Sequence, residues 1–295
     1  MITWGFTIWL YLWLAGMAAG AYFTAFLAER FGKHNDNRLL HTAIYLGVPS
    51  AMIGVLFLLV DLSYPIRFWH LFVLLNSTSP MSIGSWLLVL WSAISVLIVF
   101  LWHMRNRIPI KPAILQRIKK YLHWVGFFTS ILLMSYTGVL LAASNQPLWA
   151  STALLPPLFV ISAISTGAAL LVLVSIITKM WKTHGETIRR MVQVDTIIIV
   201  VELAVLSLYL LWLFRSGIPG ANESMSQLIT GELALPFWLG VVLLAILIPF
   251  TLYIINWGKS VGKRKIVNAS FIASSICVIF GGLVLRTVIV IGGQI

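Results

Sequence analysis

The chain has 295 residues and a formal net charge of +12; 60% of its residues are hydrophobic and only 9% are charged. Its mean hydropathy is +0.99. These values exclude a soluble globular protein, because about 20 consecutive apolar residues already span a bilayer core and this chain has many such runs. They also argue against a nucleic-acid partner, since no soluble segment is long enough to present a basic patch.

Eight apolar segments follow one another along the chain, each long enough for a transmembrane helix. We therefore expect an all-α polytopic membrane protein that forms a single integral membrane domain, 1–295. The stretch from Asn145 to Pro157 divides the helices into two four-helix bundles, at about 4–143 and about 153–291. The expected spans are 4–28, 40–62, 82–104, 121–143, 153–178, 191–214, 234–257 and 266–291.

Seventeen of the 20 Lys and Arg residues fall in four alternate loops. Cytoplasmic loops carry the excess of Lys and Arg, so these loops predict a cytoplasmic face and both termini outside, in a cytoplasmic (inner) membrane. Their charge also suits contact with anionic lipids of the bilayer. Glu29 and Asp36 belong to the first of these loops and are expected to be solvated. The four clusters are Arg30–Arg38, Arg105–Lys120, Lys179–Arg190 and Lys259–Lys265.

The first span starts close to Met1 without a preceding basic stretch, so we expect a retained helix rather than a cleaved signal peptide. Within it, Gly16 and Gly20 are small residues four apart, which lets a neighbouring helix approach closely. The longest outward segments are 63–81 and 215–233, and with the loop at 145–152 they form the expected docking surface for a partner.

Four ionisable residues lie within or at the ends of spans, where such groups are costly and usually functional. Asp61 is at the outer end of the second span, and Arg286 is in the outer third of the eighth. Asp195 and Glu202 are two turns apart on one face of the sixth span. One hypothesis is a structural ion pair of Arg286 with Asp61 or Glu202; the other is proton or quinone chemistry. Asp195 is also close enough to the cytoplasmic end to be simply solvated.

Tyr11 and Tyr136 each place a hydroxyl group inside an apolar span near the outer side. A buried phenol needs a hydrogen-bond partner, which can be another side chain or a ligand carbonyl such as that of a quinone. The six histidines lie in loops, at helix ends or on the outer surface segment, an arrangement that argues against a haem held by two histidines. The single cysteine, Cys277, cannot ligate an iron–sulfur cluster, which needs about four.

Several motifs together resemble the NrfD/polysulfide reductase membrane subunit family. The segments Asp61–His70 and Asn76–Trp86 are similar to the family signature after the second helix. Ser135–Trp149 resembles its fourth helix and following loop, and Phe237–Gly240 with Leu285–Gln294 resemble its seventh and eighth helices. The resemblance extends from the first span to the last.

The resemblance implies an eight-helix subunit of two four-helix bundles, without haem and without a covalently held cofactor. It implies non-covalent binding of menaquinone or another quinone near the outer face. It also implies two-electron exchange with a ferredoxin-like iron–sulfur subunit docked on that face, which serves a catalytic subunit that is often a molybdopterin enzyme. The chain itself would then not act on the terminal substrate.

The same resemblance assigns roles to individual residues. Tyr136 matches the quinone-contacting tyrosine of the fourth helix, whereas Tyr11 stands where some members carry a histidine in the first. Asp61 begins the acidic motif beside the same pocket, and His70 lies in the same outer segment. Arg286, Asp195 and Glu202 fall where members are thought to place groups of a proton path.

An alternative from a different class is an ion or proton-coupled transporter that uses Asp195, Glu202 and Arg286 as its coupling site. Such a protein predicts inverted repeats and helices broken at mid-membrane. Pro249 offers one kink in the seventh span, but no matching interruption is found in the other half of the sequence. The quinone-reactive subunit is therefore the preferred hypothesis.

Overall fold

The computed structural model describes residues 4–32, 37–61, 79–104, 112–144, 146, 148–149, 152–257, 259 and 265–294, and within these ranges all regular structure is helical. The predicted all-α class is therefore confirmed. The helices are α1 (Phe6–Arg30), α2 (Arg38–Asp61), α4 (Pro80–His103), α5 (Pro112–Ala142), α6 (Leu155–Ile177), α7 (Trp181–Arg215), α8 (Ala221–Ile229), η2 (Pro236–Leu247), α9 (Ile248–Ile255) and α10 (Lys265–Gly292).

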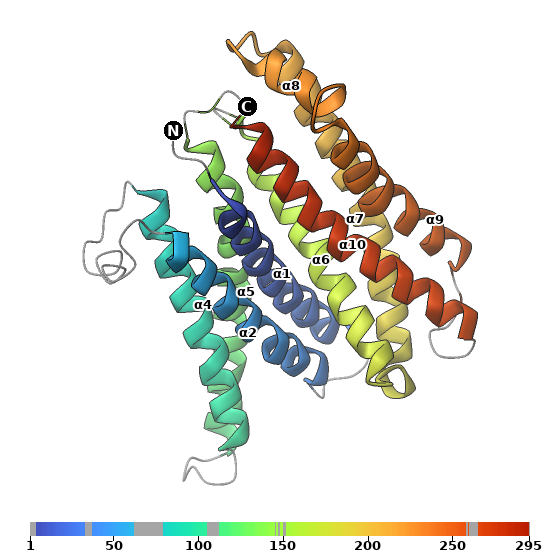
Figure 1. Ribbon diagram of the computed structural model, residues 1–295. Coiled ribbons are helices and arrows are strands. Elements are labelled where there is room, and N and C mark those ends of the chain that lie inside the picture. Colours follow the sequence, from blue (N-terminus) through green and yellow to red (C-terminus); the bar gives the residue numbers. More distant parts are fainter. Residues whose placement is uncertain are drawn as a thin grey trace.

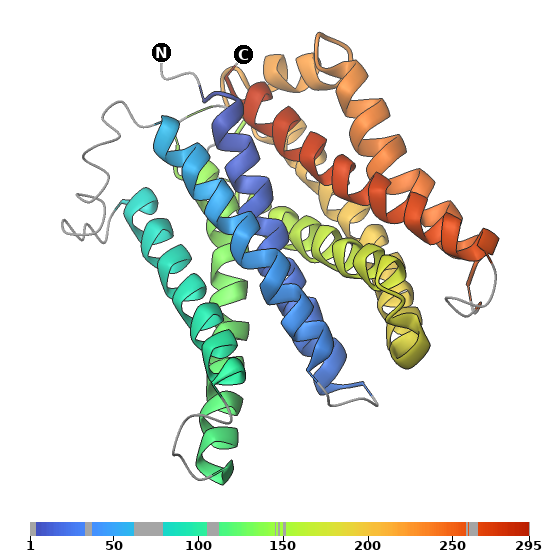
Figure 2. The same cartoon turned by 60° about the horizontal axis from the view of Figure 1, so that its bottom comes forward.

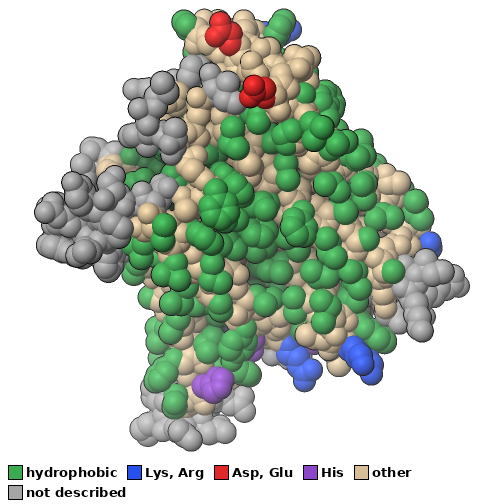
Figure 3. All heavy atoms as spheres, viewed as in Figure 1, with side chains coloured by type: hydrophobic (Ala, Val, Ile, Leu, Met, Phe, Trp, Pro, Cys, Tyr) green, Lys and Arg blue, Asp and Glu red, His purple; other side chains and the backbone are tan. Residues whose placement is uncertain are grey.

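Eight spans of the described chain are long and apolar enough to cross a membrane, with η2 and α9 together forming one of them. Many of their apolar side chains face outward, for example Leu56 at 60% exposure and Phe128 at 58%. In Figure 3 hydrophobic side chains cover most of the visible face between the two ends of the molecule. Such a surface is unfavourable in water and suited to lipid tails, so the chain is a multi-pass membrane protein.

The helices α1 and α6 pack against each other at the centre of the molecule, and each also contacts α5, α7 and α10. Glycines allow this close approach. A Cβ atom at Gly20 would lie 1.9 Å from the carbonyl oxygen of Ala163, and one at Gly167 would lie 2.1 Å from the backbone nitrogen of Ala21. The small residues of the first span therefore admit a neighbouring helix, as the sequence predicts.

The two termini lie at the same end of the bundle, together with α8 (Figure 1). We call this end the outer end. The opposite end, where α1 ends and α2 begins, is the basic end, and Figure 3 shows basic side chains gathered there. The helices α4 and α5 lie on one side of α1 and α9 on the other (Figures 1 and 2). The division into two four-helix bundles, and which end faces the cytoplasm, stay predictions.

Two helices begin well before the apolar windows that predict them. α5 begins at Pro112 rather than near 121, and α7 begins at Trp181, with a kink at His184, rather than near 191. Hydropathy detects only the membrane-embedded turns, whereas a helix continues wherever its side chains form local pairs. In α7 the ion pairs of Glu186 with Arg189 and Arg190, at 2.8 and 3.4 Å, support the added turns.

The charged loop after α1 also differs from expectation, because Glu29 is buried, with 6% exposure. Its carboxylate accepts a hydrogen bond of 3.0 Å from the backbone N–H of Leu40. The first N–H groups of a helix lack partners within the helix, so a carboxylate at this position stabilises the start of α2. The prediction that Glu29 is solvated was wrong, and Asp36 lies outside the described residues.

Candidate functional site

Tyr11 and Tyr136 lie close together in the outer half of the bundle, although they come from α1 and α5. Tyr11 is 0% exposed and Tyr136 is 5% exposed. The two phenol groups interact with each other. The hydroxyl group of Tyr11 nevertheless has no partner at hydrogen-bond geometry among the described residues. A buried donor without a partner costs about 1–3 kcal/mol, so this hydroxyl is poised for a ligand acceptor.

Two glycines make room for these phenol rings. A Cβ atom at Gly84 in α4 would lie 1.7 Å from Cζ of Tyr136, so the Tyr136 ring occupies the space that any side chain at Gly84 would fill. Gly54 in α2 is looser, because its Cβ would lie 3.4 Å from Cδ2 of Tyr11. All four residues are four to seven positions from the outer ends of their helices, hence about 6–10 Å deep at 1.5 Å per residue.

Of two further residues predicted for this site, the structure describes only the backbone of Asp61 and nothing of His70. Asp61 is the last residue of α2, about 10 Å along the helix from Gly54 by the rise per residue, and its side chain lies outside the description. His70 lies outside the described residues altogether. The backbone of Asp61 therefore lies nearer the outer end of the bundle than the tyrosine pair does.

Arg286 lies in the second half of the bundle and is fully buried, at 0% exposure. Its Nη1 donates to the carbonyl oxygen of Gly282 at 2.7 Å and to the hydroxyl oxygen of Ser162 at 3.4 Å. The guanidinium carbon lies 5.5 Å from the ring centre of Phe159, a cation–π arrangement. Its Nε and Nη2 groups have no partner among the described residues. A Cβ atom at Gly16 of α1 would lie 3.0 Å from Nη2, so α1 closes this site too.

Glu202 and Arg286 influence each other electrostatically, and Ser162 interacts with both. The described residues show no N–O contact within 4.0 Å between the charged groups of these two side chains, so they do not form a direct ion pair. The predicted structural pair of Arg286 with Glu202 is thus replaced by a longer-range interaction through a shared serine. The other predicted pairing, with Asp61, involves a side chain that lies outside the described residues.

Asp195 lies seven residues before Glu202 and is also buried, at 1% exposure. The prediction that it could be simply solvated was wrong, because its side chain is enclosed inside the bundle beside Ser165 of α6 and Tyr253 of α9. Neither carboxylate oxygen has a hydrogen-bond partner among the described residues. The hydroxyl groups of Ser165 and Tyr253 interact with it without reaching that geometry.

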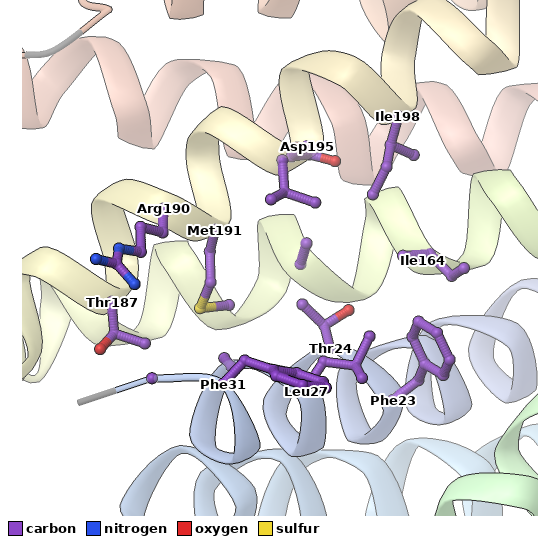
Figure 4. A pocket seen from close by; sticks show the side chains of 14 residues that line it. Phe23, Thr24, Leu27, Phe31, Ile164, Thr187, Arg190, Met191, Asp195 and Ile198 are labelled. Carbon is purple, nitrogen blue, oxygen red and sulfur yellow. The ribbon is translucent and has the colours of Figure 1, made fainter. Parts of the chain in front are cut away.

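Asp195 also lines a cavity of about 330 Å³ between α1, α6 and α7. Figure 4 shows Phe23 and Leu27 of α1, with Phe31 just after this helix, on one side of the cavity and Met191 on the other. The walls are almost entirely apolar. Asp195 contributes to the wall of this apolar cavity, but both of its carboxylate oxygens are buried rather than exposed to it.

Sequence reasoning missed four hydroxyl groups around the buried charged residues Asp195, Glu202 and Arg286: Ser162 and Ser165 of α6, Tyr253 of α9 and Ser275 of α10. Tyr253 interacts with both Asp195 and Ser275. Serines in membrane helices usually bond their own backbone, so they carry little signal in a sequence. Tyr253 could have been found, because it is a phenol inside an apolar span like Tyr136.

A buried phenol alone does not identify a ligand site. The hydroxyl group of Tyr209 donates to the carbonyl oxygen of Leu148 at 2.8 Å, and that of Tyr22 donates to the carbonyl oxygen of His123 at 3.5 Å. Both are structural. Tyr11 and Tyr253 differ from them because their hydroxyl groups lack such an acceptor within the described residues. No group of three or more His, Cys, Asp and Glu residues able to hold a metal ion occurs in the described ranges.

Comparison with known proteins agrees with the resemblance. The profile of the family described as "Polysulphide reductase, NrfD" matches residues 1–295. A polysulfide reductase polypeptide of Wolinella succinogenes is 28% identical over 308 residues, which cover 99% of this chain and 95% of that protein. Protein NrfD of Escherichia coli strain K12 is 28% identical over 310 residues, covering 100% and 96%. A selenate reductase subunit of Mesobacillus selenatarsenatis is 23% identical over 310 residues, covering 94% and 72%.

Proposed function

This chain belongs to the polysulphide reductase NrfD family, and we propose that it is the quinone-reactive membrane subunit of a respiratory oxidoreductase complex. In this proposal it exchanges two electrons between menaquinone, or another quinone, and an iron–sulfur partner subunit. The relatives named above include subunits of polysulfide and selenate reductases, which supports membership of such a complex. The whole-chain match supports this function over the transporter alternative. The seventh span passes from the π-helix η2 into the α-helix α9 without a gap in the helix, and Pro249 is the second residue of α9.

The observation that carries the proposal is the buried hydroxyl group of Tyr11, which lacks a partner among the described residues while it lies beside Tyr136. A quinone headgroup presents two carbonyl oxygens, and two phenols at one depth are suitable donors to them. A bound quinone would supply two-electron, two-proton chemistry. Tyr136, held against Gly84, would fix the orientation of the headgroup, and Asp61 and His70 would exchange protons with water at the outer end.

Asp195, Glu202 and Arg286 are proposed to form a proton path through the second half of the bundle. The spacing of the two carboxylates along α7 is about 10 Å at 1.5 Å per residue. Hydroxyl groups flank each of them, Ser165 beside Asp195 and Ser162 beside Glu202. These hydroxyls can hold the waters that a proton needs between two carboxylates.

The electrons require a partner, because the single cysteine of the sequence cannot ligate an iron–sulfur cluster. We propose that a ferredoxin-like iron–sulfur subunit docks on the outer end, where α8 offers Glu223 to solvent and the following turn offers Glu232. That subunit would pass electrons to or from a catalytic partner, often a molybdopterin enzyme in this family. The protein described here would anchor the complex and would not itself act on the terminal substrate.

The proposal is tested with Tyr136→Phe, measured in membranes that contain the assembled complex. Loss of one hydrogen bond of about 1–1.5 kcal/mol should weaken quinone binding about five- to tenfold. Tyr209→Phe is the matched control, since it removes an equally buried phenol that bonds only to Leu148, and it should leave quinone kinetics unchanged. Equal kinetics in the two variants would return Tyr136 to a structural role.

A further inference from the structure

A second cavity, of about 380 Å³, opens at the basic end between α1, α2 and α5. We call it the basic cavity. It is far from the tyrosine pair, and its lining differs from that of the cavity beside Asp195 because polar and apolar groups contribute about equally. The residues that matter for its chemistry are Glu29, Arg30, Lys119, Lys120, Phe26 and Trp124.

The cavity carries a net positive charge. Arg30 ends α1, and Lys119 and Lys120 are adjacent in the first turns of α5, so three cations face one carboxylate, that of Glu29. The carboxylate already accepts a hydrogen bond from the N–H of Leu40, and Glu29 is buried. Arg30 and Lys120, in contrast, are exposed at the rim. An anion that enters from the rim would therefore meet the cations first.

The floor of the basic cavity is aromatic. Phe26 and Trp124 contact each other with ring centres 5.0 Å apart, in an edge-to-face arrangement. Trp124 also stacks on Phe128 at 6.1 Å, and Phe128 is exposed on the outside of α5. A small soluble anion would contact only the cations and would gain nothing from these aromatic rings.

The exposed face of α5 extends from the cations into the membrane. Lys120, Trp124, Phe128 and Leu132 are four residues apart, so they lie one above another on the same face of the helix. Leu132 is 51% exposed and Phe128 is 58% exposed, and Trp124 is half-buried. The strip therefore begins with the cation of Lys120, in the third turn of α5, and continues as apolar surface from Trp124 to Leu132 for about 12 Å, at 1.5 Å per residue.

From this juxtaposition we propose that the basic cavity binds the headgroup of an anionic phospholipid, with an acyl chain along Trp124, Phe128 and Leu132. The phosphate oxygens accept hydrogen bonds from Lys119, Lys120 and Arg30, while the strip on α5 packs against the acyl tail. Basic residues that adjoin the cytoplasmic surface attract anionic lipid, and the charge distribution predicts that this end faces the cytoplasm. The lipid headgroup would contact α1, α2 and α5 at the basic end.

The test is lipid binding by the purified full-length protein, measured by native mass spectrometry after exchange into detergent with defined lipid. The probes are dioleoyl phosphatidylglycerol, dioleoyl phosphatidylcholine and glycerol 1-phosphate. We expect retention of phosphatidylglycerol over phosphatidylcholine, and little binding of glycerol 1-phosphate. The double variant Lys119→Gln/Lys120→Gln should weaken phosphatidylglycerol binding about 30-fold, at roughly fivefold for each lysine.

The matched control is Lys179→Gln/Lys182→Gln, which removes the same charge from the same end of the molecule but outside the basic cavity. It should retain phosphatidylglycerol within about twofold of the unaltered protein, as expected where surface charges are screened by salt. Equal loss in the two double variants, or no loss in either, would overturn the proposal. Phosphatidylcholine bound as tightly as phosphatidylglycerol would also overturn it, and glycerol 1-phosphate bound as tightly would reassign the cavity to soluble anions. None of these results depends on quinone activity.

Discussion

The substitution Gly84→Ala is the sharpest probe of the tyrosine pair, because it changes no hydrogen-bonding group. The added methyl carbon would lie 1.7 Å from Cζ of Tyr136 and 2.1 and 2.3 Å from the two Cε atoms. Carbon atoms in contact need about 3.5–4.0 Å, so the ring or α4 must move by about 2 Å. A hydrogen bond of ordinary length does not survive such a shift.

The expected result is a copy of the Tyr136→Phe phenotype. Quinone affinity should fall about five- to tenfold through the lost hydrogen bond, and overpacking should reduce stability by about 1–3 kcal/mol. Gly54→Ala is the matched control on α2. Its methyl carbon would lie 3.4 Å from Tyr11 and from Leu14, which is ordinary contact, so it should change quinone affinity less than about twofold.

The assay is the apparent affinity for a water-soluble menaquinone analogue in membranes that contain the assembled complex, with thermal stability measured in parallel. The double variant Gly84→Ala/Tyr136→Phe separates the two effects. If Gly84 acts by seating the Tyr136 hydroxyl group, the double variant should bind quinone about as weakly as Tyr136→Phe alone. Additive losses, or equal losses in Gly84→Ala and Gly54→Ala, would refute the reasoning.

Three further predictions follow from the fold. A cysteine at Ser226 of α8 should react with an impermeant thiol reagent from outside, whereas one at Lys263 should not; the reverse pattern would invert the orientation. Glu202→Gln should accumulate normally, because the described residues show no direct ion pair to break, yet it should slow turnover by about tenfold or more. Failure of that variant to accumulate would support the structural ion pair. Gly20→Ala should lower the free energy of unfolding by several kcal/mol and so impair assembly, because its methyl carbon would overlap the backbone of Ala163.

The membrane spans were predictable because hydropathy acts on each helix separately. The ends of α5 and α7 were not, since Lys119 and Glu186 stand in helical turns beyond the apolar core. The environment of Asp195 was predicted wrongly for a different reason. Its distance from the charged loop suggested solvation, but its side chain is buried beside Ser165 of α6 and Tyr253 of α9.

The sequence predicted which types of residue form the candidate site, but not which groups their side chains contact. Phenols inside apolar spans pointed to Tyr11 and Tyr136, and the same signal applies to Tyr209 and Tyr253. What distinguishes them is whether a carbonyl oxygen from a distant part of the sequence reaches the hydroxyl group, as that of Leu148 reaches Tyr209. That is a property of tertiary packing. The role of Gly84 was equally hidden, because a glycine in an apolar span gives no indication of the ring it faces.

The position of α1 between the two polar regions connects the proposed quinone and proton functions. Tyr11 and Gly16 are five residues apart, so they point about 140° away from each other at 3.6 residues per turn and differ in depth by about 7.5 Å. Tyr11 meets the phenol of α5 on one side, while Gly16 admits the guanidinium of Arg286 on the other. In the proposed function, α1 would therefore separate the quinone site from the proton path. A substitution that displaces α1, such as one at Gly16, would then be expected to affect both sites.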